Sequence, residues 1–194
     1  MRAILLALIC AVGGAPVAGK EKAPVVYSIP LPPRADFTAL DWVLGDWAGK
    51  TTERSAPGEV HLSATFDLDK QFIVLRGEVS LAATKSAPSS QESWMGILSA
   101  NREGSGFVLR TFSSTGFMAR YRVTVDGPEI RLNPEGGEKP PPGWLFRRVL
   151  ARAGDGELIE TVQVAPPSKP FFDYYTAKLS RVSPPVKTTP QSPP

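Results

Sequence analysis

The sequence is poor in the residues that most often perform chemistry in proteins. It has one cysteine, Cys10, and one histidine, His61, in 194 residues. A single cysteine allows neither an internal disulfide nor a site built from several thiolates. The G-x-S-x-G, H-E-x-x-H and phosphate-binding glycine motifs are also missing. A non-catalytic role is therefore favoured, although spacing alone cannot reveal a carboxylate pair formed in three dimensions.

The sequence also lacks blocks of one charge and long apolar segments. Its formal net charge is +3, with basic residues scattered among acidic ones, so no nucleic-acid partner is predicted. The apolar run Ala3–Val12 is too short to span a bilayer as a helix. It follows Arg2 and precedes the small residues Ala18 and Gly19, a pattern typical of a secretory signal peptide. Residues 1–19 are predicted to be this peptide, and the mature chain is expected to be periplasmic or extracellular, without membrane insertion.

Proline-rich segments without periodicity flank the rest of the chain. Residues 20–35 are predicted to be an extended linker. Residues 183–194 are predicted to be a disordered tail. Residues 36–182 between them form one predicted domain of about 150 residues, long enough to build a core without disulfides. We expect this domain to be a monomer.

Alternation of apolar and polar residues dominates the predicted domain. From Glu59 to Asp69 every second residue is apolar, which is the period of a half-buried strand. Phe117–Asp126 shows the same period and runs into Asp126-Gly127, a tight-turn signal. No useful helical period follows Leu44, and a turn is predicted at Pro134–Gly143. Further strands are predicted at Ala48–Glu53, Gln71–Leu81, Glu92–Ser99, Gly106–Phe112, Glu129–Leu132, Trp144–Arg152, Glu157–Val164 and Phe171–Val182.

This succession of strands predicts an all-β fold. The expected architecture is a closed or nearly closed antiparallel up-and-down β-barrel of about ten strands, preceded by a short helix. Closure removes the exposed edges through which sheets aggregate. A two-sheet sandwich is the alternative, since it differs mainly in closure. A barrel of this size either fills its interior with side chains or encloses one small ligand.

The stretch Phe37–Glu53 joins a short apolar segment to the first strand. Gly45 lies where the backbone turns from helix-like to extended, and Trp47 is placed to plug one end of a closed sheet. Residues 44–49, LGDWAG, resemble the G-x-W opening of lipocalin-type barrels. They are more similar to the G-x-W-x-G opening of bacterial lipocalin-like (calycin) proteins and of the haem-binding nitrobindins. Residues 66–76 resemble the second hairpin of those families.

The resemblance implies that a short helix leads into the first strand and that Trp47 packs at the closed end of the barrel. In lipocalins an arginine near the last strand packs over this tryptophan, and Arg181 matches that role by position. Nitrobindins hold haem through a histidine late in the chain, where this sequence has none. His61 lies on the polar face of its strand and is expected at the surface. We therefore predict no haem, no other cofactor and no metal.

Three arginines, Arg110, Arg120 and Arg148, are candidate ligand-binding residues. An arginine that faces the barrel interior can hold an acidic head group by two parallel hydrogen bonds. The alternative for each is an outer arginine whose stem covers apolar surface. Seven aromatic residues are interpreted as core and rim: Trp42, Trp94, Trp144, Phe171, Phe172, Tyr174 and Tyr175.

The function predicted from the sequence is that of an exported lipocalin-like barrel. It would bind a small, largely apolar molecule, with or without an anionic head group, by burying its surface. Three alternatives belong to other classes. They are a filled barrel that serves as an interaction module, an uncharacterised enzyme, and a haem protein of the nitrobindin-related type.

Overall fold

The computed structural model describes residues 27–29, 33–101, 105–136 and 142–182. The predicted signal peptide, most of the predicted linker and the predicted tail lie outside these residues. The described residues from Arg34 onward belong to one compact unit. None of the described helical segments has the length and apolar character needed to cross a bilayer.

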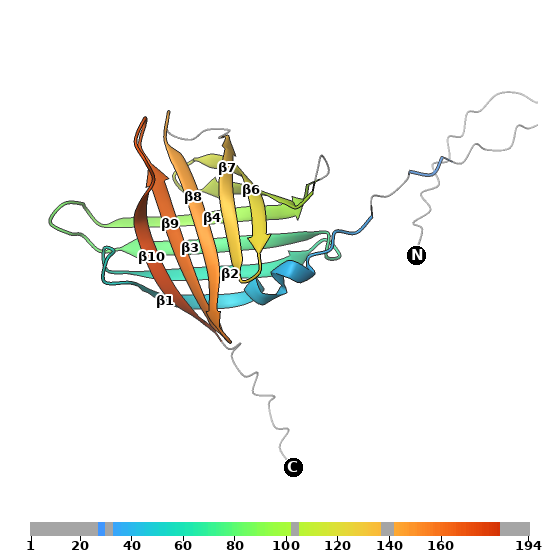
Figure 1. Cartoon of the computed structure of the whole chain (residues 1–194), viewed down its shortest axis with the longest axis horizontal. Helices are drawn as coiled ribbons and strands as arrows, with labels where there is room; N and C mark the ends of the chain where they lie inside the picture. The colour runs from blue at the N-terminus through green and yellow to red at the C-terminus, as the bar shows by residue number, and fades with distance from the viewer. Residues whose placement is uncertain (1–26, 30–32, 102–104, 137–141, 183–194) are drawn as a thin grey trace, which may run out of the picture. The chain divides into compact units, whose positions relative to one another are not determined.

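The described part of the chain forms a closed barrel, so the predicted all-β fold is confirmed. Each strand pairs antiparallel with the next strand along the chain, and the last strand pairs with the first. In Figure 1 the orange and red strands β8 to β10 cross in front of the cyan and green strands. A short 3-10 helix, η1 (Thr38–Val43), precedes the first strand. The strands are β1 (Gly45–Thr51), β2 (Gly58–Asp67), β3 (Phe72–Leu81), β4 (Ser90–Ala100), β5 (Phe107–Ser113), β6 (Met118–Asp126), β7 (Glu129–Gly136), β8 (Leu145–Gly154), β9 (Glu157–Ala165) and β10 (Phe172–Arg181).

Strand β2 shows how the alternation builds the barrel wall. Val60, Leu62 and Ala64 are buried, whereas His61 and Thr65 between and beside them are exposed. Successive side chains of a strand point to opposite faces, so one face of β2 supplies the core and the other meets solvent. The same division along the other strands places an apolar core inside the barrel.

The helix η1 and Trp47 fill one end of the barrel. Leu40 and Val43 of η1 are buried, and the Trp47 indole Nε1 donates a hydrogen bond of 2.8 Å to the Val43 carbonyl. Gly45 has a φ of 114°, which a residue with a side chain rarely adopts. A Cβ at Gly45 would also overlap the Arg181 guanidinium. Gly45 is therefore required both for its positive φ and for the space that the Arg181 guanidinium occupies.

Strand β7 is longer than the sequence predicts. The turn expected at Pro134–Gly143 begins later, because β7 continues to Gly136 with a register shift against β6. Within the described residues, β7 pairs with β8 only as far as Leu132 and Arg148. Proline lacks an N–H donor and is tolerated at strand edges. Pro134 can therefore continue the strand, because β8 no longer pairs with β7 at this point and the edge facing β8 needs no N–H donor there.

Candidate binding site

The half of the barrel away from η1 is hollow. It contains a cavity of about 640 Å³, lined mostly by apolar and aromatic side chains. Small-molecule sites typically have volumes of roughly 300–1,000 Å³. Five of the seven aromatic residues interpreted as core and rim line this cavity: Trp94, Trp144, Phe172, Tyr174 and Tyr175. The cavity is therefore the first candidate for a functional site.

The residues from Trp144 along strand β8 run from the mouth of the cavity to its floor. Trp144 is 37% exposed at the mouth, and Phe146 is half-buried in the wall. Arg148 lies further along the strand, and Leu150, at 2% exposure, belongs to the core. Because alternate residues of a strand share a face, all of these side chains share the interior side. Arg148 therefore forms the floor of the cavity, between its hollow and filled halves.

The charge of Arg148 is paired inside the barrel. Its Nη1 lies 3.0 Å from Oε1 of Glu160, a β9 residue with an exposure of only 1%. The Tyr175 hydroxyl donates a hydrogen bond of 3.3 Å to the other oxygen, Oε2, of Glu160. Ala177 faces Glu160 across the β9–β10 ladder and leaves room for its carboxylate. Removing one member of such a pair leaves an uncompensated buried charge, which is strongly destabilising.

Trp94 holds Arg148 from a second side. The guanidinium carbon of Arg148 lies 4.1 Å from the centroid of the Trp94 ring, in cation–π contact. Trp94 in turn lies against Gly77, where any Cβ would overlap the indole. A glycine inside a strand often marks such a close approach. Arg148 is therefore positioned both by an ion pair and by an aromatic ring.

Burial shifts the ionisation of the groups at the cavity floor. It raises the pKa of Tyr175 above its ordinary value of 10.0, and the Glu160 charge raises this pKa further. Burial also raises the pKa of Tyr121, which lines the cavity. For Arg148, burial is the largest single influence and lowers the pKa, but the attractions of Glu160, Tyr175, Tyr121 and Glu92 together outweigh it and the net shift is upward. At neutral pH the floor thus presents a cationic guanidinium and two protonated phenols.

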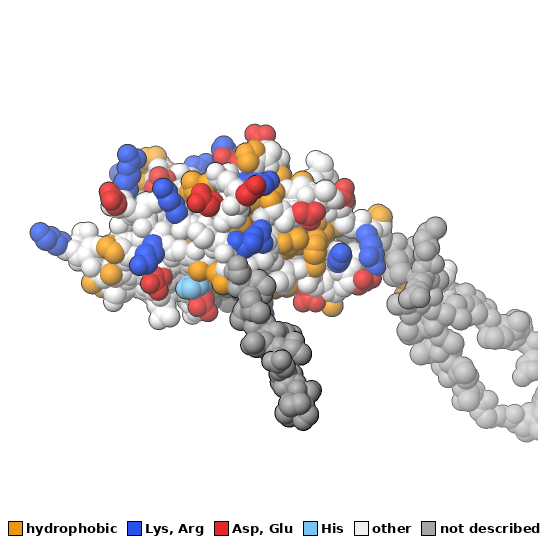
Figure 2. Space-filling view, turned by 90° about the horizontal axis from the view of Figure 1, so that it is seen from below, with side chains coloured by type: hydrophobic (Ala, Val, Ile, Leu, Met, Phe, Trp, Pro, Cys, Tyr) orange, Lys and Arg blue, Asp and Glu red, His pale blue; other side chains and the backbone are white. Residues whose placement is uncertain are grey.

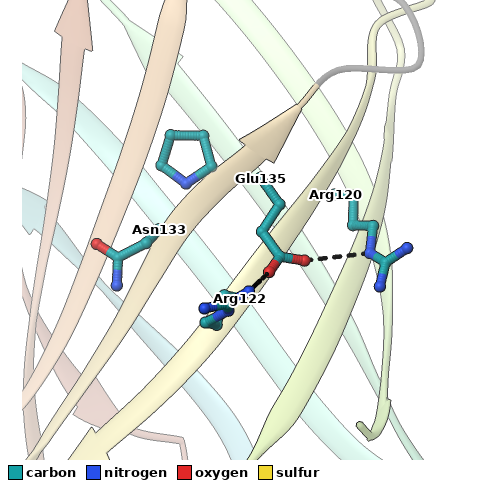
Figure 3. Close-up of a pocket in the computed structure, with 5 residues that line it drawn as sticks. Arg120, Arg122, Asn133 and Glu135 are labelled. Atoms are coloured by element: carbon teal, nitrogen blue, oxygen red, sulfur yellow. Dashed lines mark hydrogen bonds and ion pairs between the residues drawn. The ribbon is translucent and has the colours of Figure 1, made fainter. Parts of the chain in front are cut away.

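The three candidate arginines occupy three different places. Arg148 lines the cavity, as described above. Arg120 lies on the outer face of β6, with Nε 3.2 Å from Oε2 of Glu135, and Nη2 of Arg122 lies 2.6 Å from Oε1 of the same carboxylate (Figure 3). Arg110 is exposed on the outer face of β5. The structure therefore brings one of these three residues into the cavity and leaves two on the outer wall.

Gly45, Trp47 and Arg181 meet at the closed end. Trp47 and Arg181 face each other across the β1–β10 ladder, and the guanidinium carbon lies 4.3 Å from the Trp47 ring centroid. Nη1 of Arg181 donates a hydrogen bond of 2.6 Å to the Leu44 carbonyl, and Nη2 donates one of 3.3 Å to the Trp42 carbonyl. The arrangement has the geometry that the lipocalin resemblance implies. It joins the first and last strands at the end opposite the cavity mouth.

His61, the one histidine of the sequence, is exposed on the outer face of β2. Figure 2 shows histidine atoms in pale blue at the surface, among interspersed basic and acidic side chains. Within the part of the chain that the structure describes, no group of three or more His, Cys, Asp or Glu residues is placed to hold a metal ion.

Sequence reasoning did not single out Glu160, Tyr121 or Glu92, all of which contribute to the cavity or its floor. A signal for Glu160 was present, because it alternates with Leu158 and Val162 on an otherwise apolar strand face. A carboxylate in that position is buried and needs a partner. The identity of the partner, however, depends on which strands become neighbours.

Comparisons with known proteins place the chain by its fold. No family model matches it, and no curated protein matches it. Among solved structures it is similar to the crystal structure of Rv2717c from M. tuberculosis, with a TM-score of 0.55 and 21% sequence identity. The match covers 78% of this chain and 100% of that chain. At this identity the likeness shows a shared barrel fold, and the function has to be argued from the cavity.

Proposed function

We propose that the protein is a binding barrel that takes one small, largely apolar molecule into the cavity at its open end. The observation that carries this proposal is the cavity of about 640 Å³ with its aromatic and aliphatic lining. Burial of apolar ligand surface would supply most of the binding free energy, at about 25 cal/mol per Å². The few polar groups at the floor would orient the ligand.

The proposed setting is outside the cytoplasm, with the protein acting as an exported monomer. The signal-peptide pattern of residues 1–19 supports export. The pairing of β1 with β10 supports a monomer, because barrel closure leaves a second chain little free sheet edge beyond the short stretch where β7 and β8 part. In this proposal the cavity, rather than an outer surface, carries the activity.

Titration with N-phenyl-1-naphthylamine, an uncharged probe that fluoresces in apolar surroundings, tests the proposal. The wild-type chain is expected to bind it saturably at one site. Ala119 lines the cavity, so Ala119→Trp would fill it and is expected to weaken binding at least about tenfold. The matched control is Thr124→Trp, on the exposed outer face of the same strand, which should bind like the wild type. Absence of saturable binding to the wild type, or undiminished binding to a folded Ala119→Trp variant, would overturn the proposal.

A further inference from the structure

The charged groups inside the hollow half of the barrel do not balance. Among the described residues, Arg148 at the floor is the one guanidinium that points into the barrel, and Glu160 lies directly against it. Glu92 lines the cavity as a second carboxylate, and its Oε1 accepts a hydrogen bond of 2.6 Å from Ser113. One guanidinium and two carboxylates give these interior groups a formal charge of −1. The positive charge of Arg148 is therefore already neutralised before any ligand enters.

Arg147 is the remaining charged residue in the described lining of the cavity, and it belongs to the outer wall. Its Nε donates a hydrogen bond of 2.7 Å to Oε1 of Gln163. Its guanidinium carbon lies 4.4 Å from the centroid of the Phe171 ring. The amide of Gln163 continues this outer network by donating a hydrogen bond of 2.7 Å to Asp173. Arg147 thus has partners of its own and does not supply the interior with a free positive charge.

The arrangement of polar and apolar side chains in the cavity suits a ligand whose head group points inward, towards the floor. The large exposed side chains at its mouth are aromatic: Phe117, Trp144, Phe172 and Tyr174 are between 37% and 50% exposed. The floor, by contrast, consists of buried polar groups, with Glu160 and Tyr175 only 1% and 3% exposed, and Glu92 and Ser113 add a polar patch to one wall. An amphipathic molecule matches this gradient only when its polar group enters first and its apolar part remains towards the mouth.

We propose that the cavity takes its ligand polar end first and that this polar end is uncharged: a carbonyl, hydroxyl or amide group rather than a carboxylate or other anion. This inference rests on the proposed function above. Arg148 would donate a hydrogen bond to the ligand oxygen, and the Tyr121 and Tyr175 hydroxyls would provide further polar contacts. An anion would lose its hydration without gaining a net positive partner, and it would face Glu92. Because Glu160 neutralises its charge, Arg148 can donate a hydrogen bond to the ligand but does not attract an anion.

Competition between ligands that differ only in the head group tests this inference. Decanol, decanoate and decyltrimethylammonium would each be titrated against N-phenyl-1-naphthylamine bound to the full chain at pH 8, below the solubility limit of decanol and the micelle concentrations of the two ions. We expect decanol to compete at a concentration at least about tenfold lower than decanoate, which would face Glu92, or decyltrimethylammonium, whose head group would meet the Arg148 guanidinium at the floor. Any apolar cavity disfavours ions to some degree. The decisive measurement is therefore the ratio of decanoate affinity to decanol affinity, compared before and after a glutamate charge is removed from the protein.

Glu160→Gln keeps the shape of the side chain and removes the charge that neutralises Arg148. The affinity ratio of decanoate to decanol is expected to rise at least about tenfold, because an unpaired guanidinium in a site of low dielectric attracts an anion strongly. The matched control is Glu78→Gln, which removes the same charge from the exposed outer face of β3 and should leave the ratio within about twofold of the wild type. If Glu160→Gln does not fold cooperatively, Glu92→Gln replaces it, with a smaller rise expected.

The outcomes separate this inference from the proposed function. Decanoate or decyltrimethylammonium binding as tightly as decanol to the wild type would overturn the inference while leaving a binding barrel intact. A ratio in the folded Glu160→Gln or Glu92→Gln variant equal to that of Glu78→Gln would also overturn it. Failure of the probe itself to bind the wild type would overturn both proposals together.

Discussion

At the closed end of the barrel the interior is filled, by aliphatic residues such as Leu109 and Leu158, with exposures of 0% and 1%, and by Phe37 and Trp47. At the open end the interior positions of the same strands leave a cavity lined by aromatic, aliphatic and polar side chains. The change occurs within two residues along a strand. On β9, for example, Leu158 belongs to the packed core and Glu160 to the ion pair beneath the cavity.

This contrast shows how one fold can separate stability from binding. Side chains that fill an interior at crystal-like density contribute dispersion contacts and apolar burial, which is where folding stability arises. A cavity gives up those contacts, and a buried ion pair contributes little net stability. We therefore expect the closed end to hold the fold together and the open end to tolerate substitution, provided that the Arg148–Glu160 pair is kept.

The largest expected effect compares one interior residue from each end. Leu109→Ala at the closed end should lower the free energy of unfolding by about 2–5 kcal/mol, because the packed surroundings cannot collapse into the space. Phe146→Ala in the cavity wall should lower it by less than about 1.5 kcal/mol, because the side chain is only half-buried. Urea denaturation measures both values, with Phe112→Ala on the outer face of β5 as the control. Equal losses for Leu109→Ala and Phe146→Ala would contradict the division between the two ends.

A second, smaller effect concerns the phenols at the cavity floor. An unfolded tyrosine ionises near pH 10.0, whereas the folded barrel raises the pKa of Tyr175 and Tyr121. The stability that their neutral forms contribute is therefore fully present below pH 10 and is lost as the pH rises towards the folded pKa. Each such group adds a loss of up to about 1.4 kcal/mol per pH unit in that window.

Urea denaturation between pH 8 and pH 11 would measure this dependence. Tyr175→Phe is expected to flatten the alkaline decline in the free energy of unfolding, and Tyr121→Phe should do the same. Tyr174→Phe, at the exposed mouth, is the matched control and should leave the decline as it is. If Tyr175→Phe and Tyr174→Phe give the same slope as the wild type, the cavity floor is not the dry environment inferred here.

The two ends also differ in how far the sequence alone predicts them. The wall follows from alternation, as in β2, and the closed end follows from Gly45 and Trp47 through a short motif. Arg148 was identified because it alternates with apolar residues on one strand. Its partner Glu160 belongs to another strand, and only the β8–β9 register brings their side chains together. The long course of β7 through Pro134 was missed for a related reason, since it depends on where the neighbouring ladder ends.

The smallest expected effect lies at the closed end, where Arg181 covers Trp47. Partly desolvated cation–π contacts contribute on the order of 1 kcal/mol, and the two hydrogen bonds from Arg181 to backbone carbonyls do not depend on the indole. A double-mutant cycle with Trp47→Phe and Arg181→Met isolates the contact between the two side chains, since each single change keeps an apolar side chain in place. We expect a coupling of about 0.5–1 kcal/mol in the free energy of unfolding. The matched pair Trp47→Phe and Lys178→Met, whose lysine lies on the same strand and faces Lys50 instead, should show no coupling. A cycle in which Trp47 couples to neither residue would mean that strand pairing and the carbonyl hydrogen bonds alone close the barrel, and that the indole only fills space.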